Sequence, residues 1–345
     1  MRKTEPLVSP IQLIDELPIT SDIEHAVLSG REQIEKVVEG DDNRFMIVVG
    51  PCSVHDEESA LEYASKLKIL SEELRDHLLI VMRVYFEKPR TTIGWKGLIY
   101  DPNLNDTFDI ASGLRRARSL LLEIGKAGLY SGTEFLDPIV PQYIADLVSW
   151  ATIGARTTES QTHRQMASGL SMPVGFKNAT DGATQVAIDA ILSAQSPHGF
   201  LGIDRDGRTS VIQTNGNPHG HLVLRGGKHG SNYDKDSINQ AGEKLSNSGI
   251  RSQLLVDCSH GNSNKDHTKE SIAFQNVVRQ RAAGNTDIIG CMLESNLFPG
   301  NQSLNGGAEN LLYGVSITDA CIGWDETSDL LKWAHFELGS SKVSS

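Results

Sequence analysis

The sequence predicts a (β/α)8 barrel of the TIM-barrel class, with an amino-terminal extension and an inserted β-hairpin. Three observations carry this prediction. Eight short apolar runs rich in β-branched residues recur along the chain, most segments between them have helical patterning, and a polar or reactive residue follows each run. Strands that alternate with helices pair in parallel, and eight such units that close on themselves place their chemistry at the carboxyl ends of the strands.

The predicted strands are short apolar runs, which are typical of strands buried on both faces. In chain order they are Phe45–Val49, Leu79–Val84, Leu129–Phe135, Trp150–Ala155, Pro173–Phe176, His221–Leu224, Gln253–Val256 and Ile288–Leu293. Apolar residues at helical spacing predict helices between several of them. The readable helices are Ser21–Val38, Glu57–Leu74, Ile110–Ile124 and Gln142–Val148.

Two segments exceed what a minimal barrel needs. Residues 1–44 precede the first strand and form the predicted extension, and residues 45–345 form the barrel. Between Gly199 and Asn217, two alternating runs flank Asp206-Gly207, a dipeptide that favours a hairpin turn. A doubly wound sheet is the competing architecture, but it usually carries a glycine-rich phosphate loop after its first strand, where this chain has Gly-Pro-Cys-Ser.

The composition limits the partners that the protein can have. The chain has 345 residues, 39% of them hydrophobic, and Lys+Arg 32 against Asp+Glu 44 give a net charge of -12. This charge argues against a nucleic-acid or anionic-membrane partner. No apolar run approaches the roughly 20 residues that span a bilayer, and no signal peptide is recognisable. The four cysteines form no CxxC pair, so we expect reduced thiols and a cytoplasmic protein.

Cations gather after the predicted strands, although the chain as a whole is acidic. The segment MRVYFEKPRTTIGWKG, which begins at Met82, contains several of these cations within a short stretch. A single such residue is usually a surface charge, but cations on consecutive strand ends of a barrel face one shared mouth. Arginine binds phosphate and carboxylate through two hydrogen bonds, and lysine adds a point charge. The cations concerned are Arg83, Lys88, Arg90, Arg156, Lys177 and Arg225.

A second set of strand-end residues has the side chains of metal ligands: Cys52, His260, Glu294 and Asp319. Taken singly, Cys52 and His260 are more often structural residues. Jointly they indicate a metal centre, because strands one, seven and eight are neighbours in a closed barrel. A thiolate among the donors favours a divalent transition metal over magnesium or calcium.

Several long motifs resemble one known family. GPCSVHD, MRVYFEKPRTTIGWKGL, IGARTTESQTHR, PVGFKN, LRGGK, DCSHGNSNKD, GCMLESN and SITDACIGW are similar to motifs of the class I, microbial 3-deoxy-D-arabino-heptulosonate 7-phosphate (DAHP) synthases. The resemblance runs from about Pro10 to about Ala334 and is greatest to the tyrosine-sensitive isoenzyme. It implies a metal-dependent barrel that condenses phosphoenolpyruvate with erythrose 4-phosphate, the first step of the shikimate pathway and aromatic amino-acid biosynthesis.

The resemblance also assigns roles to residues. It implies Mn, Fe, Co or Zn at Cys52, His260, Glu294 and Asp319, and catalytic roles for Lys88, Glu134 and His260. Phosphoenolpyruvate would contact Arg83, Lys88, Arg156, Lys177 and Arg225, beside Gly154 and Ala155. Erythrose 4-phosphate would contact Lys88, Pro89, Arg90 and Thr91. An aromatic amino-acid inhibitor would contact Phe135, Gln142, Met166, Leu170, Ser171, Phe200, Gly202 and Ile212, in a homo-oligomer (a dimer or a tetramer).

Gly202 favours tyrosine as the inhibitor, because a missing side chain leaves room beside the ring of the ligand. Two other functions compete with the implied one. A related synthase joins phosphoenolpyruvate to arabinose 5-phosphate, but the KPRTT motif and the long extension favour the four-carbon acceptor. A catalytically dead regulatory barrel would be expected to lose metal ligands, and all four are present.

Overall fold

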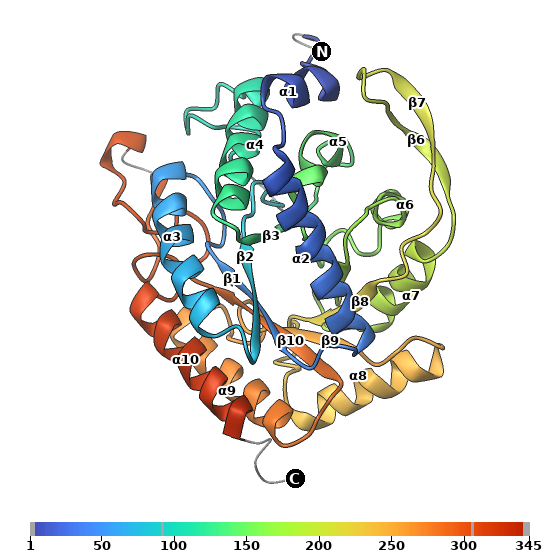
Figure 1. Ribbon diagram of the computed structural model, residues 1–345, viewed down its shortest axis with the longest axis vertical. Coiled ribbons are helices and arrows are strands. Elements are labelled where there is room, and N and C mark those ends of the chain that lie inside the picture. The colour runs from blue at the N-terminus through green and yellow to red at the C-terminus, as the bar shows by residue number, and fades with distance from the viewer. Residues whose placement is uncertain (1–3, 91–92, 305–306, 341–345) are drawn as a thin grey trace.

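A computed structural model describes residues 4–90, 93–304 and 307–340. Eight strands form a closed barrel in the order β1-β10-β9-β8-β5-β4-β3-β2, and every neighbouring pair is parallel. Helices surround the barrel (Figure 1). The predicted (β/α)8 class is therefore confirmed.

Each barrel strand overlaps one of the eight predicted runs. Their bounds are β1 Phe45–Gly50, β2 Leu78–Arg83, β3 Tyr130–Glu134, β4 Trp150–Ile153, β5 Val174–Lys177, β8 Gly220–Leu224, β9 Leu254–Asp257 and β10 Ile288–Glu294. Nearly every residue in them is buried, as expected for strands covered on both faces.

The helices begin and end where the local sequence caps them. The Thr20 hydroxyl accepts from the amide of Ile23 at the start of α2, and Gly40, with φ +75°, ends that helix. The α-helices are α1 Pro10–Glu16, α2 Ser21–Glu39, α3 Glu57–Glu73, α4 Ile110–Lys126, α5 Pro141–Ile144, α6 Gln161–Ser168, α7 Gln185–Ala194, α8 Lys235–Asn247, α9 Glu270–Ala282 and α10 Trp324–Ser340. Short 3-10 turns are η1 Ala145–Leu147, η2 His267–Lys269 and η4 Ala308–Asn310. The predicted helix at 142–148 is thus split between α5 and η1.

Two apolar layers stabilise the fold. The larger layer lies between the strands and the surrounding helices. The smaller layer fills the barrel interior, where Trp150 is the bulkiest member, and Ile34, Val37 and Val38 of α2 pack against it. Helix α2 therefore closes the amino-terminal end of the barrel, and it crosses the barrel strands in Figure 1.

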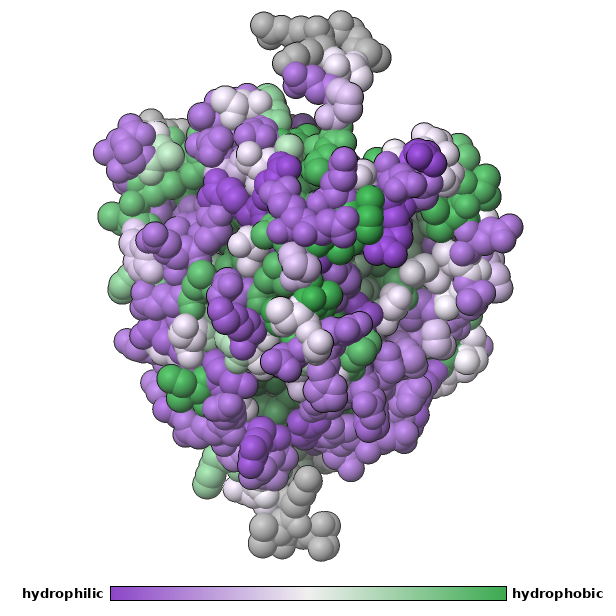
Figure 2. Space-filling view, turned by 45° about the horizontal axis from the view of Figure 1, so that its top comes forward, coloured by the Kyte–Doolittle hydropathy of each residue, from purple (hydrophilic) through white to green (hydrophobic). Residues whose placement is uncertain are grey.

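The predicted hairpin consists of β6 Gly199–Ile203 and β7 Thr209–Gln213, an antiparallel pair separate from the barrel sheet. It stands at the edge of the molecule in Figure 1, and its tip contacts α1 through the amide of Ile11, which donates to the carbonyl of Arg205 at 2.9 Å. Leu201 and Val211 face each other across the strands and are 78% and 70% exposed. In Figure 2, hydrophilic side chains dominate the surface, and separate hydrophobic patches interrupt it.

His221 is a buried histidine of the barrel interior. Its Nε2 atom lies 3.1 Å from the indole Nε1 of Trp150, and burial lowers its pKa to about 4. The neighbouring His219 instead lies 3.0 Å from the carboxylate of Glu39. Among the described residues, no helix combines the length and the apolar character that crossing a membrane requires.

Candidate active site

A cavity of about 130 Å³ opens at the carboxyl ends of the barrel strands. It gathers the predicted cations from β2, β4, β5, β8 and the loops that follow them. The predicted substrate residues on its wall are Arg83, Lys88, Pro89, Arg90, Gly154, Ala155, Arg156, Lys177 and Arg225. Thr91 lies outside the described residues. The structure therefore brings together segments more than 140 positions apart in the sequence, which explains why an acidic chain concentrates cations here.

The predicted metal-ligand side chains lie at one side of this mouth. One donor atom each from Cys52, Glu294 and Asp319 lies within 4.8 Å of the other two. The Nε2 atom of His260 lies 3.8 Å from Glu294 Oε1. One sulfur, one imidazole nitrogen and two carboxylates form a donor set that fits a divalent transition metal.

Cys52 is fully buried beside Lys88, whose Nζ atom lies 2.7 Å from the thiol sulfur and 3.0 Å from Asp319 Oδ2. Burial, followed by the charge of Glu294, raises the pKa of Cys52 to about 12. Lys88 has the largest effect on Asp319 and lowers its pKa. The ammonium group therefore balances the negative charge of this donor set when no metal is bound.

Arg83 orients Glu294 from inside the barrel. Its side chain is 1% exposed, and Nη2 lies 2.8 Å from Glu294 Oε1. Two further hydrogen bonds go to the carbonyls of Pro51 and Cys52, and the guanidinium stacks 3.5 Å above the ring centre of Tyr85. Such a pair is fixed rather than solvated, so Glu294 faces the cavity in one orientation.

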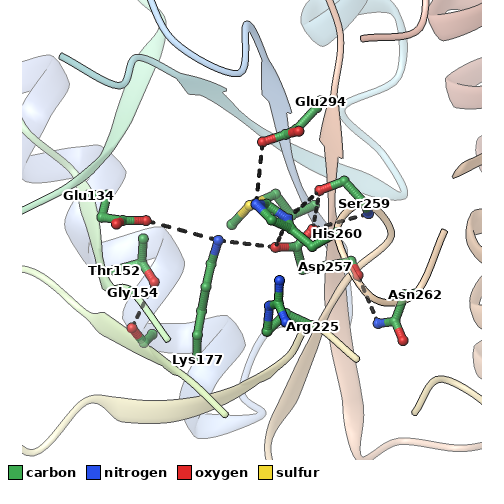
Figure 3. Close-up of polar contacts among 12 residues, drawn as sticks. Glu134, Thr152, Gly154, Lys177, Arg225, Asp257, Ser259, His260, Asn262 and Glu294 are labelled. Atoms are coloured by element: carbon green, nitrogen blue, oxygen red, sulfur yellow. Dashed lines mark hydrogen bonds and ion pairs between the residues drawn. The ribbon is translucent and has the colours of Figure 1, made fainter. Parts of the chain in front are cut away.

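Asp257 holds two predicted site residues in place, although the sequence did not indicate it. This fully buried carboxylate ends β9, and its Oδ2 atom lies 3.0 Å from Lys177 Nζ and 3.0 Å from His260 Nδ1 (Figure 3). Ser259 donates its hydroxyl to the other oxygen at 2.6 Å. Burial alone would raise the pKa of Asp257, but Lys177 and His260 lower it well below its ordinary value.

The backbone of His260 has φ +56°, a left-handed conformation that costs a non-glycine residue about 1–3 kcal/mol. Contacts of Nδ1 with Asp257 and with the Ser259 hydroxyl, at 2.7 Å, fix the ring despite this cost. Figure 3 shows a ring nitrogen of His260 on the Glu294 side, and Nε2 lies 3.8 Å from Glu294 Oε1. With a proton on Nδ1, the lone pair of Nε2 is free on that side. This is the tautomer that a metal ligand requires.

Glu134 lies across the cavity from Asp257, with Lys177 between them (Figure 3). Its Oε2 atom is 4.0 Å from Lys177 Nζ. A side-chain carbon at position 154 would lie 2.5 Å from Glu134 Oε1, so Gly154 provides the space that this carboxylate occupies. Lys177 is thus shared by two carboxylates.

Arg156 and Arg225 supply positive charge without a carboxylate partner in the described structure. Arg156 is exposed at the mouth, and Arg225 is partly buried. Burial lowers the pKa of Arg225; the charge of Asp257 opposes this shift, and the smaller repulsion of Arg156 adds to it. Asn178 accepts from the amide of Arg225 at 2.8 Å and fixes the backbone there. Two like charges on the wall of one cavity favour an anionic ligand there.

Two other buried carboxylates on the wall of this cavity were not predicted. Glu270 lines the cavity and accepts from the amide of Glu294 at 3.0 Å, and burial raises its pKa well above the ordinary value. Glu87 precedes Lys88 and accepts from the amides of Leu136 and Asp137. Neither has a neighbour in sequence that signals its contacts.

A second cavity, of about 820 Å³, lies between the hairpin and helices α5 and α6. Seven of the eight residues that the family resemblance assigned to an inhibitor line it: Gln142, Met166, Leu170, Ser171, Phe200, Gly202 and Ile212. Phe135 is fully buried and is not part of the wall. A side-chain carbon at Gly202 would lie 2.7 Å from Cγ1 of Ile212, so glycine enlarges the cavity at that point.

Comparisons with known proteins identify relatives over nearly the full length of this chain. The chain is 52% identical over 332 residues to the Tyr-sensitive phospho-2-dehydro-3-deoxyheptonate aldolase of Escherichia coli, covering 96% of this chain and 93% of the relative. It is 51% identical over 332 residues to the Phe-sensitive enzyme of that species, covering 96% and 94%.

A solved structure of phospho-2-dehydro-3-deoxyheptonate aldolase from Francisella tularensis superimposes with a TM-score of 0.96 at 45% identity, covering 99% of both chains. The family model described as the DAHP synthetase I family matches residues 18–332, which include every described strand of the barrel and all the cavity residues discussed above. The chain therefore belongs to the DAHP synthetase I family.

Proposed function

We propose that the protein condenses phosphoenolpyruvate with erythrose 4-phosphate to give 3-deoxy-D-arabino-heptulosonate 7-phosphate and phosphate, the first step of the shikimate pathway. One observation carries this proposal: a cluster of cations lies beside a Cys, His, Glu and Asp donor set at one barrel mouth. The names of the relatives, all phospho-2-dehydro-3-deoxyheptonate aldolases, support the same reaction.

Phosphoenolpyruvate carries a phosphate and a carboxylate, and Arg156, Lys177 and Arg225 match these charges. An anion between Arg156 and Arg225 relieves the repulsion that lowers the pKa of Arg225. Asp257 and the backbone contacts of Arg225 hold two of these cations in place before the substrate arrives. Preorganised charges of this kind stabilise a developing negative charge without reorganisation.

Cys52, His260, Glu294 and Asp319 would hold a divalent Mn, Fe, Co or Zn ion. The bound ion would supply Lewis acidity toward the aldehyde oxygen of the acceptor. Lys88 lies against this donor set, so its ammonium group can also hydrogen-bond to that oxygen. Pro89, Arg90 and Thr91 follow Lys88 in the chain and are proposed to bind the phosphate of erythrose 4-phosphate.

The bond changes then follow from the positions of these groups. The methylene carbon of phosphoenolpyruvate attacks the aldehyde carbon, and the new C–C bond leaves positive character on the carbon that bears the phosphate. Water adds there, and phosphate leaves by C–O cleavage. Glu134 is the proposed group that orients the water, because it faces the cavity and contacts Lys177.

The second cavity is proposed to bind an aromatic amino acid that inhibits the enzyme, tyrosine in preference to phenylalanine or tryptophan. Its volume and the space beside Gly202 support this assignment. Titration of the enzyme with all three amino acids tests it, and stronger inhibition by phenylalanine or tryptophan than by tyrosine would rule tyrosine out.

A homo-oligomer, either a dimer or a tetramer, is proposed because Leu201 and Val211 form an exposed apolar pair on the hairpin. Sedimentation of the wild-type protein and of Leu201→Lys measures the oligomeric state. All four cysteines are unpaired thiols, which fits the cytoplasmic location that we propose.

The reaction is tested by following phosphoenolpyruvate consumption with erythrose 4-phosphate or arabinose 5-phosphate, each with and without a chelator. We expect turnover only with the four-carbon sugar and loss of turnover with the chelator. A preference for arabinose 5-phosphate would favour the related synthase. No turnover with either sugar after addition of Mn, Fe, Co and Zn would favour a dead barrel.

The roles of the arginines are tested separately. Arg156→Ala and Arg225→Ala should each lower kcat/KM by a factor equivalent to about 2–4 kcal/mol, as for removal of one preorganised donor. Arg75→Ala changes an exposed arginine far from the cavity and serves as the control. Unchanged kcat/KM in either variant would contradict its place in the substrate site.

A further inference from the structure

The two cavities are connected by a short stretch of chain after β3. Asp137 and Ile139 line the second cavity, whereas Glu134, three residues before Asp137, lines the first. On the other side, Glu87 lines the first cavity directly before Lys88. Any contact between Glu87 and residue 137 therefore joins the walls of both cavities.

Glu87 makes such contacts through its buried carboxylate, which is 2% exposed. The amide of Leu136 donates to Oε2 at 3.1 Å, and the amide of Asp137 donates to Oε1 at 3.0 Å. The carbonyl of Leu136 lies 2.7 Å from Nε2 of His163 on α6. The segment 136–137 is thus held from the substrate side by Glu87 and from the second cavity by α6.

Tyr100 adds a bridge between two carboxylates. Its hydroxyl lies 3.2 Å from Glu87 Oε1 and 3.2 Å from Asp137 Oδ2. A phenol has one proton, so it donates to one carboxylate at a time. Burial and then the charges of Glu87 and Asp137 raise the pKa of Tyr100, so the hydroxyl keeps this proton at neutral pH. Both oxygens are within reach of the hydroxyl, but the two acceptors are not equivalent, because burial raises the pKa of Glu87 to about 8.

We propose that Tyr100 is a positioning residue that couples the second cavity to the Lys88–Arg90 segment. This inference rests on the proposed function, because it requires an effector in the second cavity. An effector that moves Asp137, or neutralises its charge, changes the acceptor of the Tyr100 hydroxyl. Glu87 then exchanges its hydrogen bonds and displaces Lys88, the next residue. The effector-free and effector-bound states therefore differ in the carboxylate that accepts the hydrogen bond from the Tyr100 hydroxyl. Coupling between two sites requires a difference in contacts of this kind.

The test compares Tyr100→Phe with wild type and with Tyr313→Phe. Tyr313 also donates a hydroxyl to a carboxylate, Glu62 at 3.0 Å, but lines neither cavity. Phenylalanine keeps the ring and removes only the bridging oxygen. For Tyr100→Phe we expect the KM for erythrose 4-phosphate to rise about tenfold, while the KM for phosphoenolpyruvate stays within about twofold of wild type.

Inhibition is measured on the same samples, together with the Kd of tyrosine by calorimetry. We expect the half-inhibitory concentration to rise about tenfold in Tyr100→Phe while the Kd changes less than about threefold, because coupling is lost and binding is not. Tyr313→Phe should match wild type in every readout. A merely structural role would instead lower the unfolding midpoint without separating inhibition from binding.

Two failures are distinguishable. If wild type is inhibited by tyrosine and Tyr100→Phe is inhibited equally with the same KM values, the inference is wrong and the proposed function stands. If wild type neither condenses the two substrates nor binds an aromatic amino acid, the proposed function is wrong and the coupling is wrong with it.

Discussion

Asp257→Asn is the substitution that tests the site most directly. It keeps the shape of the side chain but removes the charge that faces Lys177 and His260, each at 3.0 Å. The new amide nitrogen would face an ammonium group and an imidazole N–H. We therefore expect loss of stability, of metal affinity and of activity, although Asp257 touches neither substrate nor metal in the proposed mechanism.

The magnitude follows from the two carboxylates that share Lys177. With an effective dielectric constant of about 20, the gross attraction of Lys177 to Asp257 at 3.0 Å is about 5.5 kcal/mol, and its attraction to Glu134 at 4.0 Å is about 4 kcal/mol. Removing one partner of a buried ion pair costs about 3–5 kcal/mol. Because Lys177 keeps Glu134 as a partner, we expect the free energy of unfolding to fall by about 3 kcal/mol, the lower end of this range.

Metal affinity should fall about 10- to 100-fold, because Asp257 fixes the ring of His260. The assays are urea unfolding of the metal-free protein, calorimetric titration with Mn or Zn, and kcat/KM with both substrates. Asp189→Asn, at an exposed carboxylate on α7, is the matched control. Wild-type metal affinity together with wild-type kcat/KM in Asp257→Asn would refute the positioning role.

Three further outcomes are expected. Metal binding at pH 7 should release about one proton, because burial raises the pKa of the Cys52 thiol to about 12 and the metal ligand must be the thiolate. Calorimetry in buffers of different ionisation enthalpy measures the number of protons released, and Cys52→Ser should show neither proton release nor metal binding. Burial lowers the pKa of His221 to about 4 in the folded state, so the free energy of unfolding is unaffected by this group above pH 6.5 and falls by up to about 3 kcal/mol as the pH drops towards 4. In a plot of unfolding free energy against pH, His221→Asn should remove this decrease, whereas His25→Asn, at an exposed position, should not. Gly202→Ser should weaken inhibition by tyrosine and shift preference towards phenylalanine, because the new side chain meets Ile212; an unchanged inhibition profile would count against the assigned cavity.

The fold was predictable because its signals are local. Each barrel strand is buried on both faces and is therefore a short apolar run, and the hairpin turn has Gly207 at φ +80°, a conformation that glycine favours. The clustering of cations was predictable for a related reason, since the carboxyl ends of parallel strands meet at one mouth.

The supporting carboxylates were not predictable in this way. Asp257, Glu87 and Glu270 each contact at least one partner that is distant in the sequence, and a single carboxylate at a strand end is ordinarily a solvated group. Only the folded barrel shows that Asp257 lies between Lys177 and His260, 80 residues before it and 3 residues after it. The same holds for Tyr100, whose two acceptors lie 13 and 37 residues away.

The floor of the barrel limits how the chain can be shortened. Ile34, Val37 and Val38 of α2 cover the barrel interior, so a truncation that removes α2 would expose that interior to water. The segment before Thr20 does not cover the barrel interior; it packs Leu13 against the surrounding helices and places α1 against the tip of the hairpin. Cutting after Ile19 should therefore weaken the proposed inhibition by an aromatic amino acid, and a cut at the first barrel strand should yield insoluble protein.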